Sequence, residues 1–218
     1  MNISIKQSLN LIILASIAGT VSAQEYVLRI EGGPNQVDLS GGSVSMTLDV
    51  IGDIFVSQGR EYMTGGAFSL ETFGAAEVES IVWIPADWSE SNIDGGFSNS
   101  GIYGEVHFGQ HYTMNDWVPR PGSAMGSRIG SFQITLAQQD AAVGDFYAEL
   151  IHGSRYTLGS INALTGESYY STPDTLTFEN FSTQVTPAPS GLGLAFIVGV
   201  FGCRRNRASV RNKSVISR

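Results

Sequence analysis

The sequence predicts an all-β domain folded as an antiparallel β-sandwich. Turn-forming residues, among them 26 Gly in a chain of 218 residues, recur about every 8–12 positions. Between the turns lie short runs of β-formers in which apolar and polar residues alternate, the pattern of a strand with one face on a core. No segment of the domain has the periodicity of a long helix, and residues 138–143 form one helical turn at most. Many short strands with Gly-rich turns favour a sandwich over a helical or βαβ domain.

The clearest strand is expected at residues 43–50. Its even-numbered residues from Val44 to Val50 are apolar, and its odd-numbered residues from Ser43 to Asp49 are polar. Two long irregular segments, residues 85–101 and 109–126, have the length of functional or disordered loops. About nine to eleven strands are expected, at residues 26–30, 37–39, 43–50, 54–56, 67–73, 78–84, 102–108, 128–136, 146–151, 156–161 and 176–181.

Charge is divided sharply along the chain. All 20 acidic residues lie between Glu25 and Glu179, where only five Arg and no Lys occur, so this region has a net charge of −15. The other basic residues are Lys6 and a group beginning at Arg204. An acidic, Lys-free domain repels phosphate backbones, which argues against nucleic-acid binding. The single Cys, Cys203, lies outside the domain, so burial alone must stabilise the fold.

Residues 1–23 have the pattern of a secretory signal peptide. Lys6 precedes an apolar run at residues 9–18, and small residues precede the junction between Ala23 and Gln24. Signal peptidase is expected to cleave at this junction. The apolar run of about ten residues is shorter than the roughly 20 that a membrane-spanning helix needs. The alternative, an uncleaved anchor, is therefore disfavoured.

The C-terminal tail follows the domain predicted at residues 24–182. Residues 183–190 are expected to be a polar linker in which Pro187 and Pro189 hold the chain extended. Residues 191–203 carry no charge, and as a helix they span about 20 Å against a bilayer core of about 30 Å. Flanking residues and local thinning make up the difference. The basic residues 204–218 then hold the C-terminal end in the cytoplasm.

This three-part tail resembles the PEP-CTERM sorting signals of bacteria. Pro187, Ala188 and Pro189 match the motif, residues 191–203 match the helix, and the pair Arg204 and Arg205 matches the basic stop. The resemblance implies recognition in the inner membrane by an exosortase, processing near the proline motif and delivery to the cell surface or matrix. Ala188 replaces the usual Glu, and residues 208–218 extend past the usual end. An ordinary membrane anchor and a buried hairpin remain alternative interpretations.

The strand pattern of the domain resembles cohesin-like and related carbohydrate-binding jelly-roll domains of bacterial surface proteins. The similarity rests on two segments that run from glycine into an amphipathic strand. One begins at Gly41-Gly42-Ser43, and the other begins at Gly126 and continues to Ile134. It implies a nine-stranded sandwich, and no binding residue is transferred from it.

Two groups of polar residues have the types that ligate metal ions. Glu90, Asn92 and Asp94 alternate before Gly95, as in the first half of a calcium loop, but Gly101 stands where the closing Glu belongs. A looser Ca²⁺ site is one interpretation and a solvated loop the other; no other cofactor is predicted. His107 and His111 share one strand face but lie about 13 Å apart, too far for one ion unless the chain bends at Gly109.

Exposed aromatic residues indicate sugar binding, because aromatic faces stack on the apolar faces of sugars. Trp88 and Trp117 fall in predicted loops and are the candidates, whereas Trp83 lies in an apolar run and is expected in the core. No nucleophile or metalloprotease motif is present, and a glycosidase carboxylate pair cannot be located.

The sequence thus predicts an exported, non-enzymatic surface or matrix protein. Its expected partners are signal peptidase, an exosortase-type enzyme, the inner membrane, and a glycan, matrix component or surface protein. A secreted carbohydrate-active enzyme and a Ca²⁺-stabilised structural module are the alternatives.

Overall fold

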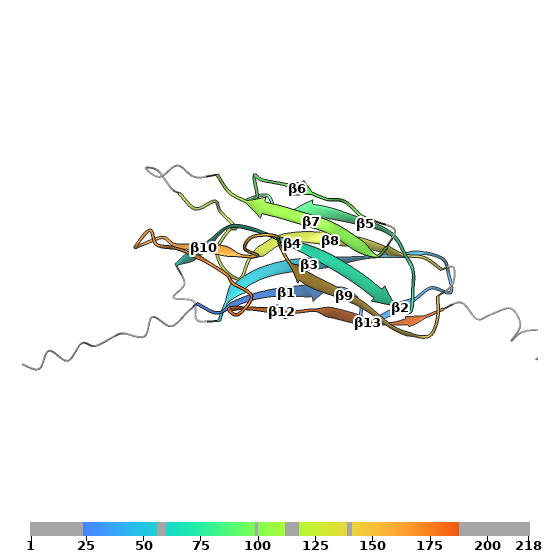
Figure 1. The fold of residues 1–218 in the computed structure, drawn as a ribbon. Helices are drawn as coiled ribbons and strands as arrows, with labels where there is room; N and C mark the ends of the chain where they lie inside the picture. The colour runs from blue at the N-terminus through green and yellow to red at the C-terminus, as the bar shows by residue number, and fades with distance from the viewer. Residues whose placement is uncertain (1–23, 56–59, 99, 112–117, 139–140, 188–218) are drawn as a thin grey trace, which may run out of the picture.

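Two β-sheets pack face to face in the computed structural model, which describes residues 24–55, 60–98, 100–111, 118–138 and 141–187 (Figure 1). No described residue is helical, and the predicted all-β sandwich is confirmed. The segment at residues 138–143, expected to form one helical turn at most, is described only in part.

The first sheet has five strands, with β3 at its centre. Their order is β12 (Leu176–Glu179), β1 (Tyr26–Gly32), β3 (Val44–Ile54), β8 (Arg128–Leu136) and β5 (Val78–Pro85). The predicted alternation holds in β3, where Met46, Leu48 and Val50 are buried and Ser45 and Thr47 are exposed. This sheet therefore presents one apolar face to the core and one polar face to water.

The second sheet has eight strands and is built around the long strand β4. Its main path is β11 (Ser168–Tyr170), β10 (Gly159–Asn162), β4 (Glu61–Gly74), β9 (Gly144–His152), β13 (Phe181–Thr186) and β2 (Gln36–Asp38). Strand β7 (Ile102–Gly109) pairs with β4 along its other edge, and β6 (Ile93–Asp94) pairs with β7. β4 is thus flanked by β7 on one side and by β9 and β10 in succession on the other.

Aromatic side chains from both sheets meet in the core. Phe68 of β4 lies 5.6 Å from Trp83 of β5 and 6.2 Å from Phe132 of β8, ring centroid to ring centroid. Trp83 is 7% exposed, as its apolar neighbours predicted. Edge-to-face rings of this kind add to the stabilisation that comes from buried area.

The first two strands of the domain pair with the last two, one such pair in each sheet. β1 pairs in parallel with β12, and β2 pairs in parallel with β13. The chain therefore crosses from one sheet to the other at Gly33, between β1 and β2, and again at Asn180, between β12 and β13. Asn180 accepts a hydrogen bond from the Leu150 amide at 3.0 Å, which satisfies a strand amide where the chain crosses over.

Several predicted boundaries are corrected by the structure. Residues 176–181, expected as one strand, are divided between β12 and β13. Residues 183–186, expected in the linker, belong to β13, where Thr183 and Val185 are buried. Ile54 ends β3 and does not begin a strand of its own, while residues 156–158 form a loop before β10. β6 and β11 were not predicted.

The predicted leader and anchor lie outside the described residues. This applies to residues 1–23 and 188–218, which include the helix expected at residues 191–203. Within the described part of the chain, no helix has the length and hydropathy required to span a bilayer.

Candidate functional site

A groove lies where β4 begins and β7 ends, and this end of the second sheet is at the left of Figure 1. It consists of two adjoining cavities with volumes of about 410 Å³ and 210 Å³. Ser91, Phe108 and Tyr156 line both cavities, so the two share a boundary at these residues.

The floor of the groove is nearly free of side chains, because Gly65, Gly66 and Ala67 form it. β9 ends opposite Phe68 and β10 begins opposite Gly65, so residues 153–158 are looped out between them. This loop lies against the β4 backbone, where the Ala67 amide donates to the Tyr156 carbonyl at 3.1 Å. A Cβ on Gly66 would lie 2.1 Å from the Thr157 carbonyl oxygen, so the close approach requires glycine.

One wall joins the loop to β7 through Glu105. Glu105 Oε1 accepts a hydrogen bond from the Ser154 amide at 2.6 Å, and Oε2 lies 3.6 Å from His107 Nε2. The Ser154 amide hydrogen bond, helped by the nearby His107, lowers the pKa of Glu105. The carboxylate is therefore ionised near neutral pH, with Oε2 left to accept from a ligand.

Two tyrosines form the aromatic part of the groove. The rings of Tyr156 and Tyr170 lie 4.7 Å apart, centroid to centroid, at an interplanar angle of 50°. Tyr156 is 36% exposed and Tyr170 is 49% exposed. Burial raises the pKa of Tyr156, with a further contribution from Tyr170, so the phenol stays neutral. Tyr156 thus presents an uncharged aromatic ring to the groove, and the Tyr170 ring lies next to it.

Arg155 brings a guanidinium group to the same wall. Arg29, Arg120 and Arg128 each form an ion pair with a carboxylate. No described carboxylate lies within ion-pair distance of Arg155. Its N–H groups are therefore available to a ligand in the groove.

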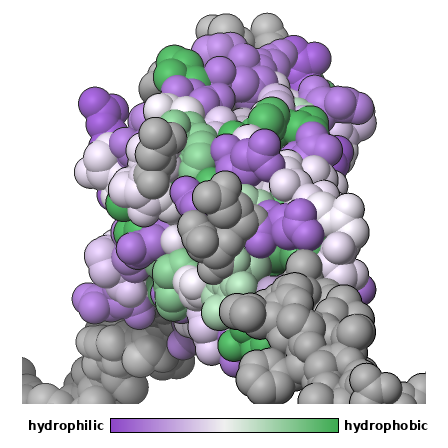
Figure 2. Space-filling model, turned by 90° about the vertical axis from the view of Figure 1, so that its right-hand side faces the viewer, coloured by the Kyte–Doolittle hydropathy of each residue, from purple (hydrophilic) through white to green (hydrophobic). Residues whose placement is uncertain are grey.

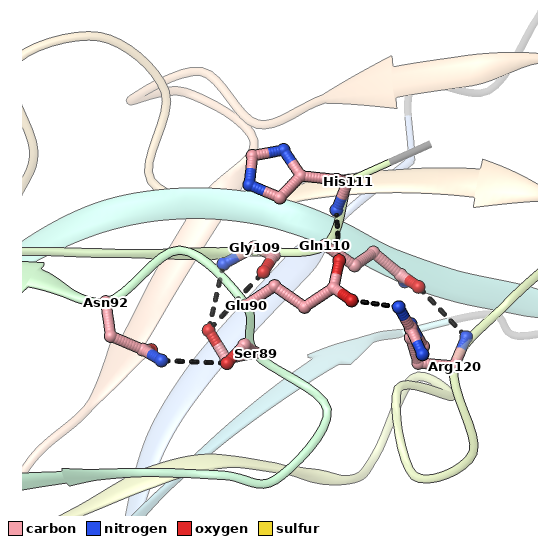
Figure 3. Close-up of polar contacts among 7 residues, drawn as sticks. All are labelled: Ser89, Glu90, Asn92, Gly109, Gln110, His111 and Arg120. Carbon is pink, nitrogen blue, oxygen red and sulfur yellow. Dashed lines mark hydrogen bonds and ion pairs between the residues drawn. The ribbon is translucent and has the colours of Figure 1, made fainter. Parts of the chain in front are cut away.

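A polar network fixes the far end of the groove (Figure 3). Ser89 Oγ accepts from the Gly109 amide at 3.1 Å, which ties the segment after β5 to the end of β7. Buried Gln110 donates to the Met63 carbonyl and accepts from the Arg120 amide at 2.9 Å. Glu90 pairs with the Arg120 guanidinium and accepts from the His111 amide. The network holds the groove residues Gln110 and His111 in place.

The structure corrects the prediction for Trp88. Its side chain is 4% exposed, lies edge-to-face with Phe108 at 6.2 Å, and donates through Nε1 to the Arg128 carbonyl at 2.8 Å. A ring enclosed in this way has no face free for a sugar. Trp117 lies outside the described residues.

Glu90, Asn92 and Asp94 are not brought together. The Glu90 amide bonds the Gly109 carbonyl, whereas Asp94 pairs with Val106 about 10 Å farther along β7. Asn92 donates its side-chain amide to the Ser89 carbonyl. Among the described residues, no three His, Cys, Asp or Glu side chains form a metal-binding group. The oxygen-ligand set expected from the sequence is therefore dispersed.

The residues of the cleavage and sorting motifs fall mostly outside the described chain. Gln24 is described, and its Oε1 accepts from the Tyr26 hydroxyl at 3.0 Å. Pro187 follows directly after β13. Ala23, Ala188, Pro189, Arg204 and Arg205 lie outside the described residues.

Sequence reasoning missed Glu105, Arg155, Tyr156 and Tyr170 as site residues. Residues 156–161 read as one strand, which hid the loop that carries Tyr156. A usable signal was the rarity of Arg in an acidic domain, because one of only five Arg directly precedes a Tyr.

The described residues at the opposite end of the sandwich form no contiguous apolar patch in the view of Figure 2. Figure 2 views the molecule from the right-hand side of Figure 1, and the apolar residues in that view form separate small patches among polar ones. A docking surface for a large apolar partner would be a contiguous patch. The described surface in this view has none.

Comparison with known proteins adds only a likeness of fold. No family model and no curated protein matches the chain. A non-cellulosomal cohesin from the hyperthermophilic archaeon Archaeoglobus fulgidus is 7% identical with a TM-score of 0.41, over 78% of this chain and 97% of the cohesin. A type III cohesin module from a cell-surface anchoring scaffoldin of Ruminococcus flavefaciens is 9% identical with a TM-score of 0.40, over 76% and 89%.

Such likeness is not confined to cohesins. The Calx CBD1 domain is 13% identical with a TM-score of 0.35, over 76% of this chain and 99% of that domain. Cohesin modules, which the strand pattern resembles, are thus among the similar solved structures. Similarity at this level assigns no ligand, partner or activity to the chain.

Proposed function

We propose that the chain is an exported, non-enzymatic protein of the cell surface or extracellular matrix, with its β-sandwich as a binding or structural module. The observation that carries the proposal is the pairing of a secretory leader with a sorting-type tail around an acidic domain. Seven of the 12 basic residues lie in the leader and the tail. Positive charge at these places is what membrane insertion of a signal peptide and the orientation of a membrane anchor require.

The maturation route follows from these two ends. Signal peptidase cleaves after Ala23, and the tail holds the protein in the inner membrane. An exosortase-type enzyme then acts near Pro187, Ala188 and Pro189 before delivery to the surface. An ordinary anchor is the simpler alternative for the tail, and it leaves the domain at the same membrane.

The position of the groove supports a binding role. β13 ends at the right of Figure 1, whereas the groove lies at the left, where β4 begins. Ala67 in the groove floor is about 23 Å along β4 from Gly74, which lies beside the tail end of the sheet. A tail attached to the membrane at Pro187 therefore leaves the groove at the distal end, accessible to partners.

The chemistry of the groove supports a non-enzymatic role. Glycoside hydrolysis needs two carboxyl groups, one of them a general acid with a raised pKa. Glu105 is the only carboxylate among the described residues that line the groove, and its pKa is lowered. The arrangement suits recognition of a ligand and not cleavage of a glycosidic bond.

Mass spectrometry of the mature protein from its own cells tests the export and sorting steps. We expect an N-terminus at Gln24 and a C-terminus near Pro189. A chain that begins at Met1 would overturn export, and an intact Arg218 would replace sorting with a plain anchor. Release of reducing sugars from a polysaccharide panel, lost in Glu105→Gln, would overturn the non-enzymatic assignment.

A further inference from the structure

We infer that the groove is a binding site for a neutral glycan, with a pyranose ring stacked on Tyr156. Sugar stacking needs an uncharged aromatic ring with one face open to solvent. Tyr156 is 36% exposed, and its ring lies 4.7 Å from the Tyr170 ring, centroid to centroid. A ring packed against a neighbour loses less conformational freedom when a ligand binds than an isolated ring does.

The polar groups around Tyr156 match the needs of sugar hydroxyls. Each hydroxyl both donates and accepts, so a sugar site presents donors and acceptors together. Glu105 Oε2 accepts, and Arg155 donates through a guanidinium without a carboxylate partner among the described residues. His107 adds a ring nitrogen on the same wall.

The size and shape of the groove fit several linked sugars. Small-molecule sites have volumes of about 300–1,000 Å³, and the two cavities of about 410 Å³ and 210 Å³ adjoin each other. The two cavities share Tyr156 in their lining, so a ligand of several rings can extend past this residue from one cavity into the other.

The charge of the domain selects a neutral glycan. Residues 25–179 have a net charge of −15, which repels polyanions such as uronic-acid polymers. Among the described residues that line the groove, the cationic Arg155 and the ionised Glu105 carry opposite formal charges. The groove itself is therefore close to neutral.

The test is a binding titration of the full chain, in mild detergent, against cellohexaose, xylohexaose, mannohexaose and a hexamer of galacturonic acid. We expect at least one neutral hexamer to bind. Tyr156→Ala should weaken that binding about two- to tenfold, the usual value of one aromatic contact. Arg155→Gln should weaken it in the same direction. The matched control is Phe73→Ala, which removes a 44% exposed aromatic ring elsewhere on this sheet.

Three results would overturn the inference: no binding of any neutral hexamer, unchanged affinity in both groove variants, or tighter binding of the galacturonic hexamer. Thermal unfolding of each variant shows whether a loss of binding comes from unfolding. The inference rests on the proposed binding role, but the proposal of export and the proposal of glycan binding can each be refuted without the other. Export is decided by the termini of the mature protein, and the groove by these titrations.

Discussion

The hydroxyl of Tyr103 donates a hydrogen bond to Oδ1 of Asp94 at 2.9 Å. Tyr103 lies on β7, and its ring contacts Phe132 of the opposite sheet with centroids 5.3 Å apart. Burial raises the pKa of Tyr103 to about 12, with further contributions from the Asp94 hydrogen bond and charge. Tyr103 thus joins the edge strand β6 to the core of the sandwich. The hydrogen bond to Asp94 requires the protonated phenol.

The first prediction is that this contact makes the fold sensitive to alkali. A phenol whose pKa is higher in the folded state stabilises the fold fully below its unfolded pKa of about 10. That contribution is lost as the pH rises towards about 12. Tyr103→Phe should lower the free energy of unfolding by about 1 kcal/mol at pH 7. It should also reduce the loss between pH 10 and pH 12, measured by urea unfolding.

Tyr147→Phe is the matched control, because its hydroxyl forms only a surface contact with Asp145 at 3.3 Å. It should change stability by less than about 0.5 kcal/mol at either pH. Equal alkaline slopes for the wild type and Tyr103→Phe would contradict the assignment. Tyr26 and Tyr156 also have raised pKa values, so the difference between the two proteins is the informative quantity.

A second prediction concerns Gly33, where the chain leaves β1 of the first sheet and crosses to β2 of the second sheet. Its φ is +75°, and a Cβ there would lie 2.6 Å from Leu48 Cδ2 and 2.8 Å from the Phe181 ring. Gly33→Ala should cost about 2–4 kcal/mol through backbone strain and overpacking. In Gly41→Ala the new methyl meets nothing within 4 Å, so its unfolding midpoint in urea should stay near that of the wild type. Similar midpoints for both variants would refute this account of the crossover.

The strands were predictable because their signal is local. In β3 and β8 the alternation of side chains follows directly from the period of an extended chain. β8 has the predicted bounds, and β3 covers most of the predicted segment and continues to Ile54. The alternation of residues 176–181 breaks at Asn180, which follows the polar Glu179, but a break of this kind does not reveal that the chain changes sheets there. Only the parallel partners β1 and β2, far away in the sequence, divide this segment between two sheets.

The site was harder to predict than the fold. Trp88 lies three residues after Pro85 and precedes a run of polar residues, the composition of an exposed loop, yet its side chain packs against Phe108. Tyr156 sits in a run of β-formers, yet the different end points of β9 and β10 along β4 loop it out over the groove. The positions of Trp88 and Tyr156 depend on contacts between segments that are distant in the sequence. A local sequence pattern does not contain this information.

Trp88 should therefore behave as a core residue in a third prediction. Trp88→Ala removes the contact with Phe108 and the hydrogen bond to the Arg128 carbonyl. The cost should be about 3–5 kcal/mol, in the range of large-to-small core substitutions. Trp88→Phe, which keeps an aromatic ring but loses the donor, should cost less. A variant Trp88→Ala with wild-type thermal stability would show that the ring is dispensable to the core.

The final prediction concerns Gln110, the buried amide of the network in Figure 3. Its Nε2 donates to the Met63 carbonyl and to Ser123 Oγ. Gln110→Glu keeps an acceptor for the Arg120 amide but turns a carboxylate oxygen towards the Met63 carbonyl. The buried charge should cost about 2 kcal/mol or more at pH 7.

The same variant should recover part of this loss in acid. Burial and the facing Met63 carbonyl should raise the pKa of the new carboxyl, so protonation at pH 4 restores a donor to that carbonyl. Urea unfolding at pH 7 and pH 4, expressed as variant minus wild type, measures the recovery. Gln133→Glu, on the exposed face of β8, is the control and should show little difference at either pH. If Gln110→Glu were as stable as wild type at pH 7, the Gln110 amide would not hold this end of the groove.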